Sequence, residues 1–335
     1  MLERFLLIWL IAISSVAYGW PNLLANLPEG LTWVGDPFRA SKGTPLTVLI
    51  SVTMFAIGSL LPRKEVKQVV QKWPQVLGGT TVQYAAMPLL ALLFGRLLGL
   101  SGDYFIGVAM VGCVPGAMAS NVLTLNARGN TSYSVSLTTT ATLLSPLAVP
   151  LVLGLVVSTE RSLPISIWLK TSVTLLLAVV LPVVAGFVLS ARYLRWERLA
   201  TRWCPVVANL SILWIIAVVV GVNRENLAQS RLDLLLALLG INVCGYLVGY
   251  GSARTMRLPN GMRRALTLEV GMQNAGLGAF LATQLFPDRD AIAIAPAMYT
   301  FGCMLTGTLL ARIWARRKEE GGRRKEEGGR MKEEG

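Results

Sequence analysis

The chain has 335 residues, of which 53% are hydrophobic and 15% are charged, and its mean hydropathy is +0.57. A soluble globular domain carries about 25% charged residues, so this composition excludes an ordinary soluble fold. The formal net charge of +13 is spread over loops between long apolar segments, which argues against nucleic acid as a partner. The sequence therefore predicts a polytopic α-helical membrane protein surrounded by membrane lipid.

Apolar segments follow one another along the whole chain, and a spanning helix needs roughly 20 mainly apolar residues. The first segment begins MLERFLLIWL and could be a cleaved signal peptide, but its apolar run extends to about Leu27, which favours a retained helix. We expect ten spans, at 4–26, 45–61, 74–100, 105–127, 131–156, 164–190, 205–222, 232–251, 264–285 and 291–313.

Basic residues between the spans indicate their orientation. With the N-terminus in the cytoplasm, Lys and Arg number fourteen in the inner segments before the C-terminal tail and six in the outer loops. This excess places both termini in the cytoplasm by the positive-inside rule. The tail, residues 314–335, repeats RRKEEGG without an apolar face, so we expect it to be disordered or weakly helical. Such a tail either contacts anionic lipid or is solvated without a specific role.

Two of the spans are interrupted by glycines and polar residues. The fourth contains GCVPGAMASN, residues 112–121, and the ninth contains EVGMQNAGLG, residues 269–278. Each is the fourth span of a set of five, if the ten spans are divided into two halves. Because five is an odd number, the second set of helices must be inverted in the membrane relative to the first. Interrupted spans at matching positions of two halves are typical of a secondary transporter's binding site. The sequence thus favours an all-α fold of two inverted five-helix repeats.

Glu269 is the one acidic residue among eighteen that lies within a predicted span away from its ends. A charge at mid-bilayer costs roughly 2.5–3.5 kcal/mol on insertion scales, so it needs a partner. Lys170 and Arg96 lie near span ends, and no Lys or Arg lies in the middle of a span. We therefore expect a mobile cation beside Glu269.

Oxygen-bearing side chains gather near the interruptions, as a hard cation requires. They are Gln83 in the third span, Ser120 and Asn121 in the fourth, Ser134 and Thr138 in the fifth, and Glu269, Gln273 and Asn274 in the ninth. One carboxylate among neutral oxygens suits Na⁺. The alternative is an H⁺-coupled or efflux carrier in which Glu269 binds the proton. Helix N-termini exposed at a break attract anions. This combination predicts cation-coupled transport of an organic anion.

Two other classes of function were open to the chain. A membrane-embedded enzyme needs a nucleophile with a base, a pair of acids or a metal cluster. The chain has no His, one intramembrane acid and four cysteines without CxxC spacing, so we expect no enzyme. A sensor that binds its ligand without transporting it is the other class, although no signalling domain accompanies the spans.

At these residues the sequence resembles the bile acid:sodium symporter family, and its bacterial members in particular. The resemblance rests on GCVPGAMASN, on LNARGN just after it, and on LTLEVGMQNAGLG. It implies ten helices in two inverted repeats, with broken helices 4 and 9 crossing in a bacterial inner membrane. It also implies symport of two Na⁺ with one organic anion by alternating access. The core domain would comprise 74–156 and 232–313, and the panel domain 1–61 and 164–222.

Through the same resemblance, the family's binding sites fall on residues of this chain. The first Na⁺ site would use Ser120, Asn121, Ser134, Thr138 and Glu269. The second would use Gln83, Glu269 and Gln273 with the backbone carbonyls of Val270 and Met272. Substrate would lie against Ala117, Met118, Ala119, Asn274 and Cys303. Some relatives have a small hydroxyl residue at Met118 and a His–Asn pair at Cys303 and Met304, so the choice between a bile acid and a keto- or hydroxy-acid stays open.

Overall fold

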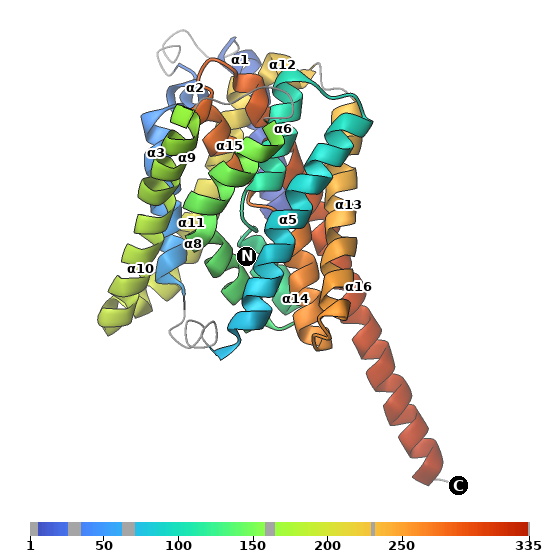
Figure 1. The fold of residues 1–335 in the computed structure, drawn as a ribbon. Coiled ribbons are helices and arrows are strands. Elements are labelled where there is room, and N and C mark those ends of the chain that lie inside the picture. Colours follow the sequence, from blue (N-terminus) through green and yellow to red (C-terminus); the bar gives the residue numbers. More distant parts are fainter. Residues whose placement is uncertain (1–5, 26–34, 62–70, 158–164, 229–231, 334–335) are drawn as a thin grey trace.

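The computed structural model describes residues 6–25, 35–61, 71–157, 165–228 and 232–333, and these form helices joined by turns. Figure 1 shows a bundle whose helices run between two ends of the molecule, with the last part of α16 projecting from one of them. We call this the tail end, and the opposite one, which carries α2 and α12, the α2 end.

The helices fall on the segments that the sequence marks as apolar. They are α1 Leu6–Ala25, α2 Pro37–Ala40, α3 Thr44–Ser59, α5 Trp73–Leu97, α6 Gly102–Cys113, α7 Ala119–Asn126, α8 Thr131–Val157, α9 Ile165–Leu175, the π-helical turn η3 Leu176–Val180, α10 Leu181–Arg192, α11 Leu194–Val222, α12 Arg224–Ala228, α13 Leu232–Thr255, α14 Asn260–Gly271, α15 Ala275–Leu285, the 3₁₀ turn η4 Asp290–Ala293 and α16 Ile294–Glu333.

Six stretches of helix within the described residues are long and apolar enough to cross a membrane. They are 73–97, 131–157, 165–192, 194–222, 232–255 and 290–315. Three shorter apolar helices, 44–59, 102–113 and 275–285, accompany them. Two of these three belong to the interrupted spans, where a break divides one apolar segment into two short helices.

Two helices, α11 and α16, extend far beyond the segments expected for them. α11 begins at Leu194 rather than at 205, because the preceding residues include Arg, Glu and Leu, which are good helix formers. The tail, for which the sequence predicts a disordered or weakly helical segment, is the last part of α16, which runs to Glu333. Glu, Lys and Arg dominate its repeat and favour helix for the same reason.

The helices form two groups, and the helices of each group pack against one another. In the first, α3 packs on α10 and α11, and α1 packs on α11; in the second, α5 packs on α6, α8 and α13, and α13 packs on α14. Glycines allow α3 and α10 to approach closely, since a Cβ at Gly58 would collide with the Val183 backbone and one at Gly186 with the Phe55 carbonyl. Small residues at such contacts are the usual means of close helix packing in membranes.

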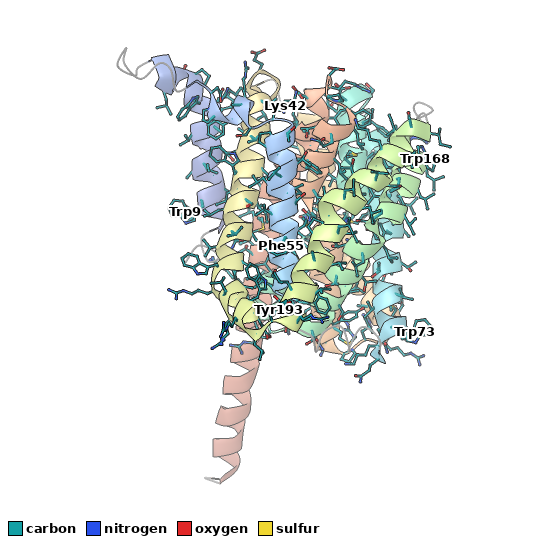
Figure 2. The ribbon with its side chains drawn as sticks, turned by 90° about the vertical axis from the view of Figure 1, so that its left-hand side faces the viewer. Trp9, Lys42, Phe55, Trp73, Trp168 and Tyr193 are labelled. Carbon is teal, nitrogen blue, oxygen red and sulfur yellow. The ribbon has the colours of Figure 1, made fainter. Side chains whose placement is uncertain are left out.

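Aromatic and charged side chains lie near both ends of the bundle. Figure 2 shows Trp73 and Tyr193 near the tail end and Lys42 and Trp168 toward the α2 end. Trp73 is 58% exposed and Tyr193 56% exposed, as expected for amphipathic rings at a membrane–water interface.

Candidate functional site

Two interrupted helices meet at the centre of the molecule. α6 ends at Cys113 and α7 begins at Ala119, while α14 ends at Gly271 and α15 begins at Ala275. The two unwound segments form an antiparallel bridge between Gly116 and Gln273. We call this meeting point the crossing.

The unwound segments satisfy each other's backbone groups. Ala117 N donates to Met272 O at 2.7 Å, and Asn274 N donates to Pro115 O at 2.8 Å. Non-helical backbone at membrane depth is tolerated where it is buried in protein and paired in this way. Both breaks expected from the glycine-rich motifs are therefore present, and they are built against each other.

The two broken helices are also joined away from the crossing. Toward the tail end, Asn130 N, at the end of the LNARGN motif, donates to Gly261 O at 2.9 Å near the start of α14. Toward the α2 end, Arg289, which follows α15, pairs with Asp103 in the first turn of α6. The crossing is thus held from both sides.

Glu269 lies beside the crossing with no exposed surface. The Ser120 hydroxyl donates to its Oε2 at 2.6 Å, and the Thr138 hydroxyl lies 2.8 Å from each carboxylate oxygen. Thr138 also lies 3.4 Å from the Asn121 Oδ1 atom. Four of the five side chains expected for the first Na⁺ site therefore come together from α7, α8 and α14.

Ser134, the fifth side chain, is placed differently. Its hydroxyl lies 3.2 Å from Thr124 Oγ1, and its backbone carbonyl accepts a hydrogen bond from Thr138 at 3.1 Å. Ser134 is thus connected to Glu269 only through Thr138, which contacts both residues. Thr124, which the sequence reasoning did not select, joins the cluster because α7 places it one turn after Ser120.

The surroundings of Glu269 suit a small cation. Its hydrogen-bond donors are hydroxyls, whose oxygens can also ligate a metal ion, and hard cations prefer oxygen. Of the Lys and Arg side chains in the described part of the chain, none forms an ion pair with it. Gly116 leaves room here, since a Cβ at this position would collide with the carboxylate.

A second polar cluster lies across the bridge. Gln83 Nε2 donates to Gln273 Oε1 at 3.4 Å, and Gln273 Nε2 donates to Val270 O at 2.8 Å. Gln83 Oε1 is buried without a hydrogen-bond partner. Because an unpaired buried oxygen is costly, this atom is suited to receive a cation or a donor. The residues expected for the second Na⁺ site are therefore neighbours, with Met272 O already bonded to Ala117 N.

Most residues expected to bind substrate lie at the crossing. Ala117, Met118, Ala119 and Asn274 are all half-buried there. Asn274 also caps α15, since its Oδ1 accepts from Leu277 N at 3.1 Å. These residues stay candidates for substrate contact.

Cys303 lies elsewhere, on α16. It is buried and lines a cavity of about 660 Å³ between α1, α11, α13 and α16. Asn242 and Tyr299 line the same cavity, and both donate hydrogen bonds to Gly271 O at the edge of the crossing. The sequence reasoning missed these two residues, although an amide within an apolar span is the signal that selected Gln83.

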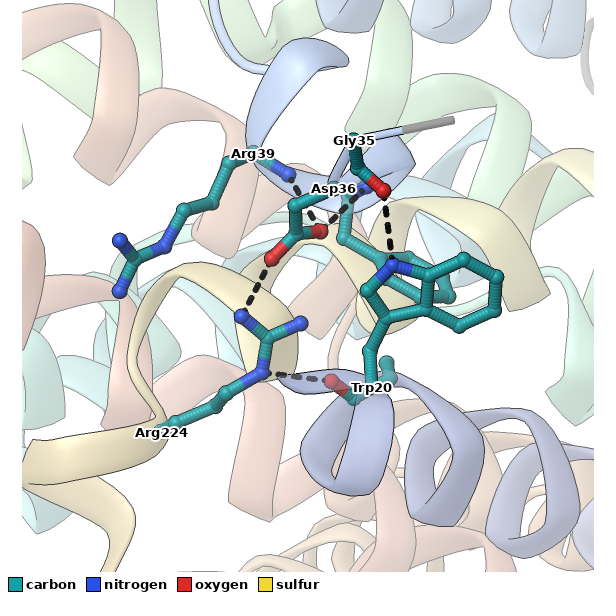
Figure 3. A network of polar contacts seen from close by, with 7 residues as sticks. Trp20, Gly35, Asp36, Arg39 and Arg224 are labelled. Atoms are coloured by element: carbon teal, nitrogen blue, oxygen red, sulfur yellow. Dashed lines mark hydrogen bonds and ion pairs between the residues drawn. The ribbon is translucent and has the colours of Figure 1, made fainter. Parts of the chain in front are cut away.

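Asp36, a partly buried carboxylate, lies at the α2 end in the network of Figure 3. Arg224 Nη1 donates to Asp36 Oδ2 at 2.5 Å, and Arg224 Nε donates to Ala17 O at 2.7 Å. Phe38 N and Arg39 N donate to Asp36 Oδ1 and cap α2. Burial alone would raise the pKa of Asp36, but Arg224 and the two N–H groups together hold it below its ordinary value.

Known proteins resemble this chain along most of its length. The model of the Sodium Bile acid symporter family matches residues 47–230. The chain is 34% identical over 311 residues to "Uncharacterized sodium-dependent transporter YocS" of Bacillus subtilis, covering 92% of this chain and 90% of that protein. It is 29% identical over 323 residues to "Probable sodium/metabolite cotransporter BASS1, chloroplastic" of Arabidopsis thaliana, covering 91% and 74%. With "Sodium/bile acid cotransporter 4" of Rattus norvegicus it shares 26% over 245 residues, covering 72% and 56%.

Proposed function

Because the chain belongs to the sodium bile acid symporter family, we propose that it carries a small organic anion across the membrane together with Na⁺, by alternating access. The family consists of transporters, so the chain is not an enzyme, and its long apolar helices make it an integral membrane protein. The observation that carries the proposal is Glu269, a fully buried carboxylate at the crossing whose donors are hydroxyls.

Two Na⁺ ions are proposed as the coupling ions. The first would be held by Glu269 with oxygens of Ser120, Asn121, Ser134 and Thr138. The second would be held by Gln83, Glu269, Gln273 and the carbonyls of Val270 and Met272. The hydroxyl cluster around Glu269 supports the first assignment, and the unpaired Gln83 Oε1 supports the second.

The proposed anion site lies at the crossing. Both α7 and α15 begin there, and helix N-termini carry partial positive charge. The half-buried residues Ala117, Met118, Ala119 and Asn274 would contact the substrate, with Cys303 as an outlying candidate. The relatives are named for metabolites and for bile acid, and we propose an organic acid of the bile-acid, keto-acid or hydroxy-acid class.

The proposed architecture is ten membrane-spanning helices in two inverted five-helix repeats, with the broken helices 4 and 9 crossing each other. It is supported by the matched breaks and by equivalent contacts, since α5 packs on α6 as α13 packs on α14. The core domain would comprise 74–156 and 232–313, and the panel domain 1–61 and 164–222. Rocking of one domain against the other would expose the crossing to each side in turn.

The proposed location is a bacterial plasma membrane with both termini in the cytoplasm. The basic residues that follow α10 and α13 support this orientation, since they lie at the tail end. The charged tail, 314–335, would then lie in the cytoplasm, where it can contact anionic lipid.

Thermal stability of the purified protein tests the ion site. Wild type and Glu269→Gln are compared in NaCl and KCl at equal ionic strength. A ligand that binds only the folded state raises stability by mass action, so Na⁺ should stabilise wild type and not the variant. A pH-dependent response that is equal in the two salts would instead favour H⁺ coupling through Glu269.

Proteoliposomes test transport. A labelled bile acid, keto-acid or hydroxy-acid should accumulate under an inward Na⁺ gradient and should exchange in counterflow. Binding without counterflow for any of these acids would favour a sensor that does not transport. Asn274→Ala should weaken the response to substrate more than the response to Na⁺, and the reverse ordering would assign Asn274 to the ion site.

A further inference from the structure

The carbonyl of Gly271 is held by two buried side chains. Gly271 ends α14, so its oxygen has no helical N–H to accept from. Asn242 Nδ2 donates to this oxygen at 2.7 Å, and the Tyr299 hydroxyl donates to it at 2.8 Å. Asn242 comes from α13 and Tyr299 from α16, and each is 1% exposed. Two helices therefore fix one carbonyl at the edge of the crossing.

A neighbouring hydroxyl sets the direction of the Asn242 amide. Thr306 Oγ1 donates to Asn242 Oδ1 at 2.7 Å, which leaves Nδ2 facing Gly271. Tyr246 closes the same cluster, with its ring against Gly271 and its hydroxyl 3.1 Å from Thr306 Oγ1. Tyr246 thus belongs to the network but directs its hydroxyl to Thr306 and not to the Gly271 carbonyl.

Gly271 lies between the two backbone carbonyls that would serve the second Na⁺ site. Val270 O accepts from Gln273 Nε2 at 2.8 Å, and Met272 O accepts from Ala117 N at 2.7 Å. Rotation of the chain about Gly271 would move one of these oxygens relative to the other. Glycine can adopt many backbone conformations, so the backbone at Gly271 is held in place by the two side chains that donate to its carbonyl.

We propose that Asn242 and Tyr299 are positioning residues for the cation site. They hold the Gly271 carbonyl so that the carbonyls of Val270 and Met272 keep the arrangement that binds Na⁺. This inference rests on the proposed function and requires no contact between either side chain and the ion. Because both residues also line the 660 Å³ cavity between α1, α11, α13 and α16, a rearrangement on that side reaches the ion site through two hydrogen bonds.

Two tyrosine variants separate positioning from general stability. Tyr299→Phe removes the hydroxyl that reaches Gly271, and Tyr246→Phe removes a buried hydroxyl of the same network that does not. Na⁺ is titrated into each full-length purified protein, with K⁺ keeping the ionic strength constant, and the melting temperature is recorded. Loss of one hydrogen bond should raise the Na⁺ half-saturation concentration of Tyr299→Phe about three- to tenfold. Tyr246→Phe should keep the wild-type half-saturation even if it melts earlier without Na⁺.

A second variant covers the case in which Tyr299→Phe does not fold. Thr306→Val frees the Asn242 amide to turn and should raise the half-saturation concentration by a smaller factor. Wild-type Na⁺ half-saturation in a folded Tyr299→Phe or Thr306→Val protein would overturn the inference while leaving the proposed function intact. A wild-type protein that shows no Na⁺ response would overturn both.

Discussion

Two carboxylates of this molecule lie among its helices with different partners. Asp36 at the α2 end is paired with a guanidinium, since Arg224 Nη1 lies 2.5 Å from its Oδ2. Glu269 at the crossing receives hydrogen bonds from the hydroxyls of Ser120 and Thr138. The fixed cation at Asp36 is always present and serves the fold. The hydroxyls at Glu269 leave its charge to an ion that can come and go, as we propose for Na⁺.

Among the variants of these two carboxylate sites, Glu269→Gln is expected to have the largest effect, which is the loss of the response to Na⁺. The amide keeps the size of the side chain and can still accept hydroxyl hydrogen bonds, but it removes the charge that would hold Na⁺. Na⁺-dependent stabilisation, about 2.7 kcal/mol at a hundredfold excess over Kd, should vanish together with Na⁺-driven uptake. Asp36→Asn is the matched control and should keep both responses. Equal Na⁺ responses in Glu269→Gln and wild type would contradict the ion assignment.

Arg224→Leu breaks the other pair. Removing one partner of a buried pair costs about 3–5 kcal/mol, but Asp36 keeps 18% of its side-chain exposure, so we expect about 1–3 kcal/mol. Thermal unfolding of the purified protein measures the loss. Adding Asp36→Asn should recover part of it, and a double variant no more stable than Arg224→Leu would show that the uncompensated charge is not the cause.

Thr138→Val tests how much a single hydroxyl beside Glu269 contributes to Na⁺ affinity. It removes a hydroxyl that lies 2.8 Å from both carboxylate oxygens and keeps the β-branched shape. We expect Na⁺ affinity to fall about three- to tenfold, measured by the Na⁺ dependence of melting. Thr124→Val is the control, because Thr124 is equally buried but its hydroxyl faces Ser134. A similar loss in both variants would point to general disturbance of the cluster.

The smallest expected effect is that of Asp36→Asn on stability at acidic pH. The folded-state pKa of Asp36 is lowered, so its contribution is fully present above the unfolded value of about 3.9 and is lost as pH falls through the folded value. Asp36→Asn should therefore flatten the decline in melting temperature below about pH 4. An unchanged decline in the variant would show that other carboxyl groups govern the acid limb.

Local composition was sufficient to predict the two breaks, and the family resemblance added that the broken helices cross. Glycine, proline and amides within apolar segments indicate a break wherever they occur, and both breaks lie where GCVPGAMASN and EVGMQNAGLG place them. The hydroxyls beside Glu269 were selected as oxygen ligands for the cation that a buried acid requires as its partner. Ser134 was selected with them, but the structure brings it near Glu269 only through Thr138.

Contacts between distant loops could not be predicted in this way. Arg224 and Asp36 are 188 positions apart, and neither lies in a periodic pattern that would indicate a partner. The link between Asn242 and Tyr299 was missed because their common acceptor is a backbone carbonyl, which no side-chain pattern reveals. α11 starts early for a related reason, since apolar content marks the membrane and not the helix end.

The crossing joins parts of the chain that are synthesised at different times. Ser120 and Thr138 precede Glu269 by 149 and 131 positions. At about 5–20 residues per second, the ribosome adds the carboxylate roughly 7–30 s after these hydroxyls. Thr138 needs no distant partner in that interval, because it donates to the Ser134 carbonyl of its own helix at 3.1 Å. Glu269 is therefore added to the chain after Ser120 and Thr138, when the two hydroxyls that donate to it have already been synthesised.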